Sequence, residues 1–381
     1  MRRILNIGSL TSEPSATRRQ LLLAAPLAPL TALVPAIASA QSDRLVGVLL
    51  PNSERIPGLR LDWRHGFQAE LMAANASVNP QYLEYPVGSH RALAAAQALL
   101  DRGCTTLTGI FNRNLATHLG ESLDRRSATF LVSDLGANAI RGDGNCDRLV
   151  RVGPNLWHQA YLAGQHFAQL GGKRALIATS FYEAGYDLPG AFQCGFIAAG
   201  GDRADTVVTG TPDITSNAAE FTRLEDALSG NAFDVLFSLY SGREATRYLQ
   251  FAQTIHKHVG SVASLSPLLH GLPQSAAVRA SKIALEVVTA HAPNRDPSIA
   301  TNQTIYTSMG RVAARAVLAS LAHGSPCPAN PQWSTTIARA PSAGAATRPA
   351  TLATAFAATD TTLASPWLAG MTSGWIAPYG A

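Results

Sequence analysis

The sequence predicts an α/β protein of two lobes, each built on a doubly wound parallel β-sheet, joined by hinge crossings. Three observations lead to this prediction. Short apolar runs alternate with helical patterns from residue 44 to about residue 322, as in successive βαβ units. The series restarts after the tripeptide Val152-Gly153-Pro154, which divides it into halves of about 110 residues. About 340 residues follow the N-terminal leader, more than a single hydrophobic core usually accommodates.

The first half contains four predicted strands with helical patterns between them. Residues 45–50 form an apolar run that Pro51-Asn52 closes, which is typical of a buried strand ending in a turn. Residues 61–76 then carry apolar side chains at helical spacing. Further strands are expected at residues 81–87, 105–111 and 128–133, and further helices at 91–102 and 115–125. Strands separated by helices of this length form parallel units with right-handed crossovers.

The second half repeats the alternation. Helices are expected at residues 158–169, 189–199, 218–228 and 242–256, and strands at 174–179, 205–208, 233–239 and 262–265. Residues 281–290 and 308–322 close the pattern. We therefore divide the chain into a first lobe, residues 41–153 completed by about 266–322, and a second lobe, residues 154–265.

The last segment, residues 323–381, is rich in Ala, Thr and Pro. It also holds Trp333, Trp367, Trp375 and Tyr379, which are too many aromatic side chains for a plain solvated tail. We expect part of this segment to pack on the lobes and part of it to be irregular.

Residues 1–40 have the features of a cleavable export signal. Arg18-Arg19 precedes an apolar, Ala-rich stretch, and Ala38-Ser39-Ala40 supplies the small residues after which a signal peptidase cuts. The paired arginines resemble a twin-arginine leader. The alternative is an amphipathic N-terminal helix of a cytosolic protein. We expect export with cleavage near Ala40, and a periplasmic product without a lipoprotein anchor, since no cysteine stands at the cleavage site.

The net charge excludes two classes of partner. The whole chain has a formal charge of +5, and residues 1–40 contribute four arginines and one glutamate, so about +2 remains after the leader. A field this weak does not predict binding to nucleic acid or to an anionic membrane surface. After the leader, no window approaches the roughly 20 consecutive apolar residues that a membrane span needs.

Four cysteines allow disulfides in an oxidising compartment. They are Cys104, Cys146, Cys194 and Cys327, and the sequence does not separate the three possible pairings. We favour Cys104 with Cys146, because both are expected in the first lobe. No CxxC motif is present, which argues against a zinc or redox site.

Six stretches, in order and at matching spacing, resemble the type I periplasmic solute-binding family, and its leucine/isoleucine/valine-binding branch in particular. The stretches are residues 45–51 with Gly66-Phe67 downstream, 109–114, 130–134, 150–154, 173–178 with Gly185-Tyr186 downstream, and 233–240. The resemblance covers about residues 44–322. It implies two lobes whose loop edges face each other and close on a small molecule, which a membrane permease of an ABC importer then receives. It implies no cofactor and no metal, and we expect a monomer.

The resemblance places the ligand contacts on loops that follow the strands. The candidate residues are Asn112, Arg113, Asn114, Ser133, Asp134, Tyr182, Tyr186, Tyr240, Ser241 and His270. Arg113 either pairs with a ligand carboxylate or is a solvated loop arginine. Ser133 matches a ligand hydroxyl of the family, whereas Asp134 either binds an ammonium group or caps the next helix.

The tyrosines and His270 bear on the nature of the ligand. Tyr186 matches the stacking tyrosine of the family, Tyr182 is the alternative, and either can instead pack at the edge of the lobe. Tyr240 directly follows a clear strand. His270 stands where amino-acid binders of this branch carry an acid for the α-ammonium group, although a structural role near the hinge is also open. These residues favour a carboxylate, amide or aromatic ligand over a branched-chain amino acid.

Signatures of catalysis are missing from the sequence. It contains no GxSxG, HExxH or Walker motif, and no GxGxxG after the first strand. We therefore expect a binding protein rather than an enzyme. Two alternatives stay open: a periplasmic ligand-sensing partner of a receptor or of an oxidation system, and an exported enzyme on a similar scaffold.

Overall fold

The computed structural model describes most of the chain between residues 44 and 351. The described residues are 44–53, 56, 58–86, 89–111, 119, 125–133, 135, 148–210, 220–255, 259–265, 268, 285–291, 304–323, 333–339 and 350–351. All of them belong to one compact unit, Asp43–Ala381. The predicted leader lies outside the described residues, as does most of the helix expected at 115–125.

The first sheet has five parallel strands in the order β2-β1-β3-β4-β5. Their bounds are β1 Arg44–Asn52, β2 Val78–Pro86, β3 Thr106–Gly109, β4 Thr129–Val132 and β5 Leu149–Arg151. Alternate side chains of β1 point to opposite faces, since Val46 and Val48 join one buried cluster and Leu49 another. The sheet is doubly wound, as the sequence predicts, and its first strand lies inside the sheet.

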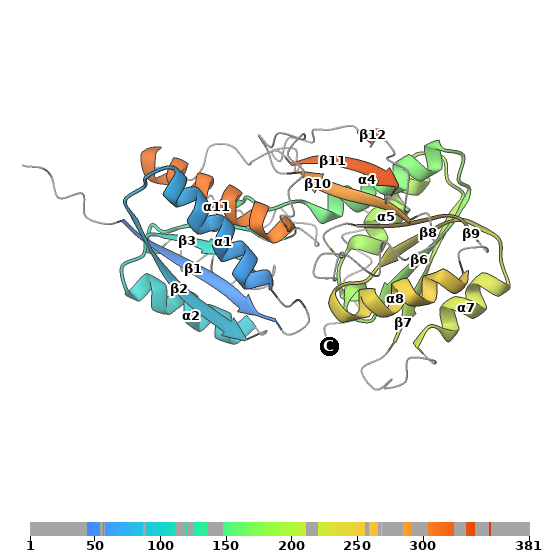
Figure 1. The fold of residues 1–381 in the computed structure, drawn as a ribbon, viewed down its shortest axis with the longest axis horizontal. Helices are drawn as coiled ribbons and strands as arrows, with labels where there is room; N and C mark the ends of the chain where they lie inside the picture. The colour runs from blue at the N-terminus through green and yellow to red at the C-terminus, as the bar shows by residue number, and fades with distance from the viewer. Residues whose placement is uncertain are drawn as a thin grey trace, which may run out of the picture. The chain divides into compact units, whose positions relative to one another are not determined.

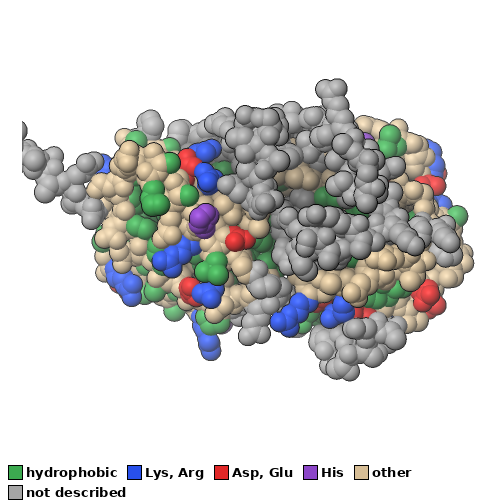
Figure 2. All heavy atoms as spheres, in the orientation of Figure 1, with side chains coloured by type: hydrophobic (Ala, Val, Ile, Leu, Met, Phe, Trp, Pro, Cys, Tyr) green, Lys and Arg blue, Asp and Glu red, His purple; other side chains and the backbone are tan. Residues whose placement is uncertain are grey.

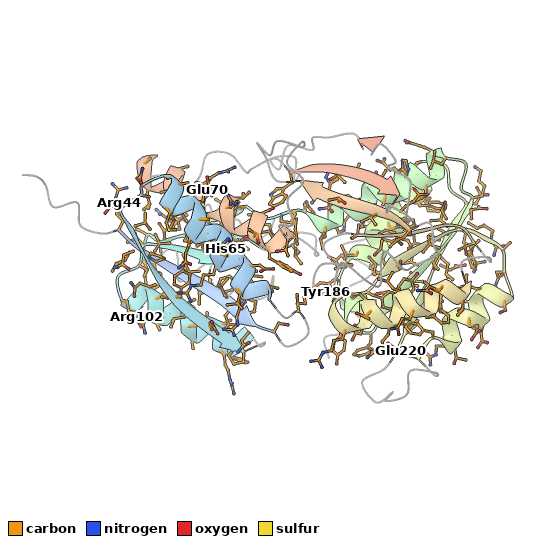
Figure 3. All side chains as sticks on the ribbon, viewed as in Figure 1. Arg44, His65, Glu70, Arg102, Tyr186 and Glu220 are labelled. Carbon is orange, nitrogen blue, oxygen red and sulfur yellow. The ribbon has the colours of Figure 1, made fainter. Side chains whose placement is uncertain are left out.

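Helices α1 (Leu59–Ala73) and α11 (Ile305–His323) cover one face of the first sheet, and α2 (Ser89–Asp101) covers the other (Figure 1). Two glycines let α1 and α11 cross closely. A Cβ at Gly66 would lie 2.0 Å from the Thr307 carbonyl oxygen, and one at Gly310 would lie 2.0 Å from the Trp63 carbonyl oxygen. Glu70 of α1, which Figure 3 labels, pairs with Arg315 of α11 at 2.7 Å. The chain thus returns to the first lobe through α11.

The second sheet has the order β12-β11-β10-β9-β8-β6-β7. The bounds are β6 Arg174–Ser180, β7 Arg203–Thr209, β8 Phe233–Leu239, β9 Val259–Leu265, β10 Leu285–His291, β11 Ser334–Arg339 and β12 Ala350–Thr351. Strands β6 to β10 are parallel to one another. Strand β11 is antiparallel to β10, and β12 is antiparallel to β11. The expected parallel sheet therefore gains an antiparallel edge, because the segment after α11 runs back beside β10.

Among the described helices, two cover each face of the second sheet. Ile177 and Phe237 pack with α4 (Leu156–Gln169) and α5 (Leu188–Ala198). Leu176 and Leu236 face the opposite way and pack with α7 (Thr222–Ser229) and α8 (Gly242–Ile255). Figure 1 shows these two helices on the other side of the sheet from α4 and α5. This alternation makes the strands apolar on both faces, which explains why each appears in the sequence as a continuous apolar run.

The predicted strands and helices that fall within the described residues agree with the structure to within a few residues, and β8 has the bounds that the sequence predicts. Strands β5, β11 and β12 have no counterpart in the prediction. The lobe boundary that the sequence places near residue 266 is corrected to a later position. Strand β10 follows residue 266 in the chain but pairs with β9, so it belongs to the second sheet. The return to the first lobe comes later, with α11. From the C-terminal segment, residues 334–339 form β11, and the indole Nε1 of Trp333 donates to the Val152 carbonyl at 3.2 Å.

Candidate functional site

The carboxyl ends of the parallel strands carry the loops in which the sequence places the ligand contacts. In open α/β sheets, ligands bind outside this edge. Half of the predicted contacts fall outside the described residues, and for these the ligand role stays a prediction. They are Asn112, Arg113, Asn114, Asp134 and His270. The structure places the other five, in one loop of the first sheet and two of the second.

Ser133 follows β4 and is fully buried. Its hydroxyl oxygen accepts a hydrogen bond from the indole Nε1 of Trp63 at 3.0 Å and donates to the Met309 carbonyl at 3.5 Å. The hydroxyl thus ties the end of β4 to both α1 and α11. A ligand contact through Ser133 stays a prediction, and it would have to share this hydroxyl with two helices.

The loop after β6 exposes three aromatic side chains. Phe181, Tyr182 and Tyr186 have 46%, 48% and 39% of their surface exposed, and the rings of Phe181 and Tyr182 meet edge to face at 5.7 Å. Few other large apolar side chains in the described residues are this exposed. Tyr186 is labelled in Figure 3. Both tyrosines are predicted contacts, but Phe181 is not; its signal in the sequence is an apolar residue directly after the strand.

Glu183 lies in the middle of this loop, at the start of the short 3₁₀ helix η2 (Glu183–Gly185), and only 5% of it is exposed. Its backbone N–H donates to the Ser180 hydroxyl at 3.2 Å. Its carboxylate Oε1 accepts a hydrogen bond from the hydroxyl of Ser241, which follows β8. Ser180 of β6 thus holds the backbone of Glu183, and Ser241, which follows the neighbouring strand β8, holds its carboxylate. The sequence gives no sign of this burial, because a loop glutamate is normally solvated.

Tyr240 directly follows β8 but lies in the core. It is fully buried, its ring stacks on Tyr248 of α8 at 4.2 Å, and its hydroxyl is 2.9 Å from the hydroxyl of Thr209. Burial raises the pKa of its phenol well above the ordinary value. A ligand contact through Tyr240 stays a prediction, while its contacts in the structure are those of a core residue. Ser241 is also buried, and its hydroxyl donates to Glu183.

Tyr306 in the first turn of α11 is influenced by carboxylates from distant parts of the sequence. It is 2% exposed. Burial raises the pKa of its phenol, and the charges of Glu183 and Asp62 raise it further. The Asp62 carboxylate in turn accepts a hydrogen bond from the Thr304 hydroxyl at 2.8 Å. The negative charges of η2 and of α1 therefore act on one group at the beginning of α11.

The remaining predictions about this part of the chain concern cysteines, metals and membranes. Cys104 is a buried, free thiol, and Cys146 lies outside the described residues, so their pairing stays a prediction. Within the described residues, no group of three His, Cys, Asp or Glu side chains is arranged to hold a metal ion. Nor does any helix in that part of the chain have the length and apolarity to cross a bilayer.

Lys and Arg side chains form no large basic patch on the described part of the face drawn in Figure 2. Lys and Arg side chains lie next to Asp and Glu side chains over the described part of this face. The mixed distribution agrees with the small net charge expected after the leader. On this face the described residues offer no surface typical of nucleic-acid binding.

Solved structures decide the fold. A solute-binding protein of an ABC transporter from R. palustris, in complex with benzoate, matches with a TM-score of 0.63 at 15% identity, over 82% of this chain and 96% of that chain. The chain has the fold of the type I periplasmic solute-binding proteins. A second solute-binding protein of this fold from R. palustris, in complex with 4-hydroxybenzoate, has a TM-score of 0.60 at 15% identity, over 77% and 92% of the two chains.

A leucine-binding protein from Thermotoga maritima shares the type I periplasmic fold as well, with a TM-score of 0.59 at 16% identity, over 81% of this chain and 97% of that chain. No family model matches the sequence, and no curated protein matches it. At these identities the likeness confirms the predicted fold, namely two α/β lobes of the type I periplasmic kind.

Proposed function

We propose that the protein is an extracytoplasmic solute-binding protein that captures a small polar, carboxylate-bearing or aromatic molecule between its lobes and delivers it to the membrane permease of an ABC importer. The fold supports this function, because parallel sheets of this kind bind ligands at the carboxyl ends of their strands. The protein works as a periplasmic monomer after its leader is cleaved near Ala40, and it uses no cofactor.

The observation that carries the proposal is the exposed aromatic side chains of the loop after β6. Clusters of exposed aromatic side chains mark binding sites, since monomeric proteins rarely expose large contiguous apolar patches that have no function. Tyr182 and Tyr186 offer flat apolar faces with a polar tip, which suit stacking against a planar ligand. Two solute-binding proteins of the same fold hold benzoate and 4-hydroxybenzoate, which supports an aromatic ligand here.

Ligand binding shifts the population of the protein from its open form to its closed form. A ligand that contacts loops of both lobes stabilises the closed form over the open form by its difference in affinity for the two. The membrane partner then recognises the closed form. This mechanism needs no reactive group, in keeping with the lack of catalytic motifs in the sequence.

The test is a thermal-shift screen of residues 41–381 against a metabolite library that includes aromatic acids, amines and amides. A compound with a Kd near 1 μM adds about 2.7 kcal/mol of stability when its free concentration is about 100 times the Kd, and a thermal shift detects this readily. We expect at least one compound to stabilise the protein saturably and without turnover. A library without any such compound would contradict the proposal, and a compound that is chemically converted would show an enzyme.

A further inference from the structure

The side-chain amide of Gln159 lies in the interior of the protein without a donor to its oxygen. Gln159 belongs to the first turn of α4 and is 2% exposed. Its carbonyl Oε1 is buried, and no atom of the described residues donates a hydrogen bond to it. Buried polar atoms of native proteins almost always have a partner, since an unmet acceptor costs free energy. Oε1 therefore needs a donor from outside these residues.

The hydrogen bonds that begin α4 do not use this amide. The side chain of Asn155 caps the helix, because its Oδ1 accepts the backbone N–H of His158 at 3.1 Å. The Asn155 carbonyl accepts the backbone N–H of Gln159, also at 3.1 Å. Asn155 thus satisfies both N–H groups, and the side chain of Gln159 takes no part in the cap.

The first turn of α4 lies where the carboxyl ends of the two sheets meet. Only residues 170–173 separate α4 from the start of β6, so the helix runs back along the sheet, and its first turn, about 20 Å from its end, is level with the carboxyl end of β6. One turn before Gln159, the Leu156 N–H donates to the Leu135 carbonyl at 2.8 Å. Leu135 follows β4 of the first sheet and packs against the buried clusters of both lobes.

The surroundings of Gln159 on α4 are apolar. Leu156, Ala160 and Ala163 belong to one buried cluster on the same helix. Burial lowers the pKa of the neighbouring His158 to about 4, so its imidazole is neutral at pH 7. An unpaired ion placed among such groups costs far more free energy than a neutral polar group. The partner that suits Oε1 is therefore a neutral donor of a hydrogen bond.

Helix α4 holds the amide in a fixed place within the second lobe. A Cβ at Gly164 would lie 2.2 Å from the Phe192 carbonyl oxygen, and one at Gly195 would lie 1.9 Å from the Tyr161 carbonyl oxygen. Contacts this close fix α4 against α5. A polar group on a rigid helix selects its partners by geometry more sharply than one on a loop.

On the basis of the proposed function, we propose that Gln159 is a ligand contact that selects compounds carrying a neutral hydroxyl or carboxamide group, which donates a hydrogen bond to Oε1. A hydroxyl or a carboxamide supplies this hydrogen without a charge. A ketone or a carboxylate has no hydrogen to give and leaves Oε1 without a donor, so the site discriminates against both.

The experiment compares three probes that share a framework and differ in one group: benzamide, acetophenone and benzoate. They carry an amide nitrogen, a methyl group and a charged oxygen at the same position. Affinities for wild-type residues 41–381 are measured by calorimetric titration at pH 7. We expect benzamide to bind roughly 10-fold more tightly than either of the others, since it alone provides the donor.

The variants assign this preference to one residue. Gln159→Met keeps the length of the side chain and removes the amide, so benzamide and acetophenone should bind within roughly 3-fold of each other. The same variant should be at least as stable in urea as the wild type, because an unmet acceptor is lost. Gln159→Leu is measured in the same way if the methionine variant fails to fold.

Gln165→Met is the matched control. Gln165 lies on the same helix, and its amide nitrogen is paired, donating to the Tyr161 hydroxyl at 3.4 Å. The substitution therefore removes an amide from α4 without touching Oε1 of Gln159. We expect this variant to keep the wild-type preference for benzamide.

The other outcomes overturn the inference. Equal affinities of the wild type for benzamide and acetophenone would show that water or the chain itself satisfies Oε1. A preference that survives Gln159→Met would belong to another residue, and a clear loss of stability in this variant would show a partner within the protein. If no probe binds, the inference fails; the proposed function fails with it only if the metabolite library also yields no ligand.

Discussion

The loops after β6 and β8 begin alike and end differently. Both strands are apolar, lie side by side in the second sheet and lead into a segment with tyrosine. After β6, Tyr182 and Tyr186 are exposed; after β8, Tyr240 is fully buried. The difference lies in the connection, because α8 begins at Gly242, directly after Tyr240 and Ser241, whereas α5 begins at Leu188, after residues 181–187.

The short connection draws its tyrosine into the core. With α8 starting at once, the ring of Tyr240 lies against Tyr248 of that helix and near Phe221. The longer connection has room for η2, and the rings of Tyr182 and Tyr186 in it are partly exposed. A tyrosine after a parallel strand thus indicates a ligand contact only when the connection is long enough to keep it out of the core.

The largest effect on stability is expected at Tyr240, the buried tyrosine of the loop after β8. Tyr240→Ala removes a fully buried ring and should lower the free energy of unfolding by about 3–5 kcal/mol. Tyr240→Phe keeps the ring and loses the contact with Thr209, which should cost about 1 kcal/mol. Urea unfolding measures both changes. A Tyr240→Ala protein as stable as the wild type would mean that this tyrosine is not part of the core.

A smaller effect is expected at the glycines of the two connections. Gly242 has a φ of 54°, so alanine at this position should cost about 1–2 kcal/mol of stability. A Cβ added at Gly185, in the loop after β6, would meet no atom within 4 Å, and Gly185→Ala should change stability by less than about 0.5 kcal/mol. The two alanine variants are compared by urea unfolding. If both alanine variants lower the free energy of unfolding by the same amount, the short connection is not more strained than the long one, and the comparison fails.

The smallest effect on stability is expected at the exposed tyrosines. Replacing both Tyr182 and Tyr186 by alanine should cost less than about 1 kcal/mol, because each is substantially exposed. The affinity for a compound found in the screen should fall roughly 10-fold, through lost stacking. Leu170→Ala is the control, since Leu170 is 67% exposed and lies outside this loop. An unchanged affinity would remove these tyrosines from the site.

The fold could be predicted because its signals are local. Strand β8 is a continuous apolar run between turn residues, and its bounds follow from the sequence alone. Strand β11 could not be predicted, because its sequence, Ser334–Arg339, is short and lies in a segment rich in Ala and Thr. Its partner β10 precedes it by more than forty residues, and such pairings are invisible to local patterns.

The site could be predicted as a set of loops but not as a set of exposed side chains. The burial of Tyr240 depends on where α8 begins, and that of Glu183 depends on Ser241 from another loop. Both are properties of the folded chain. Ser133 shows the same limit, because the residues that use its hydroxyl, Trp63 and Met309, are far from it in the sequence.

Hydrogen exchange with and without a compound that stabilises the protein tests the central claim most directly. Residues 181–187 should exchange quickly in the free protein and become protected on binding, since they carry the ligand contacts. Residues 240–241 should be protected in both states, because they belong to the core. Unchanged exchange at residues 181–187, together with new protection elsewhere, would contradict the assignment of the site to the loop after β6.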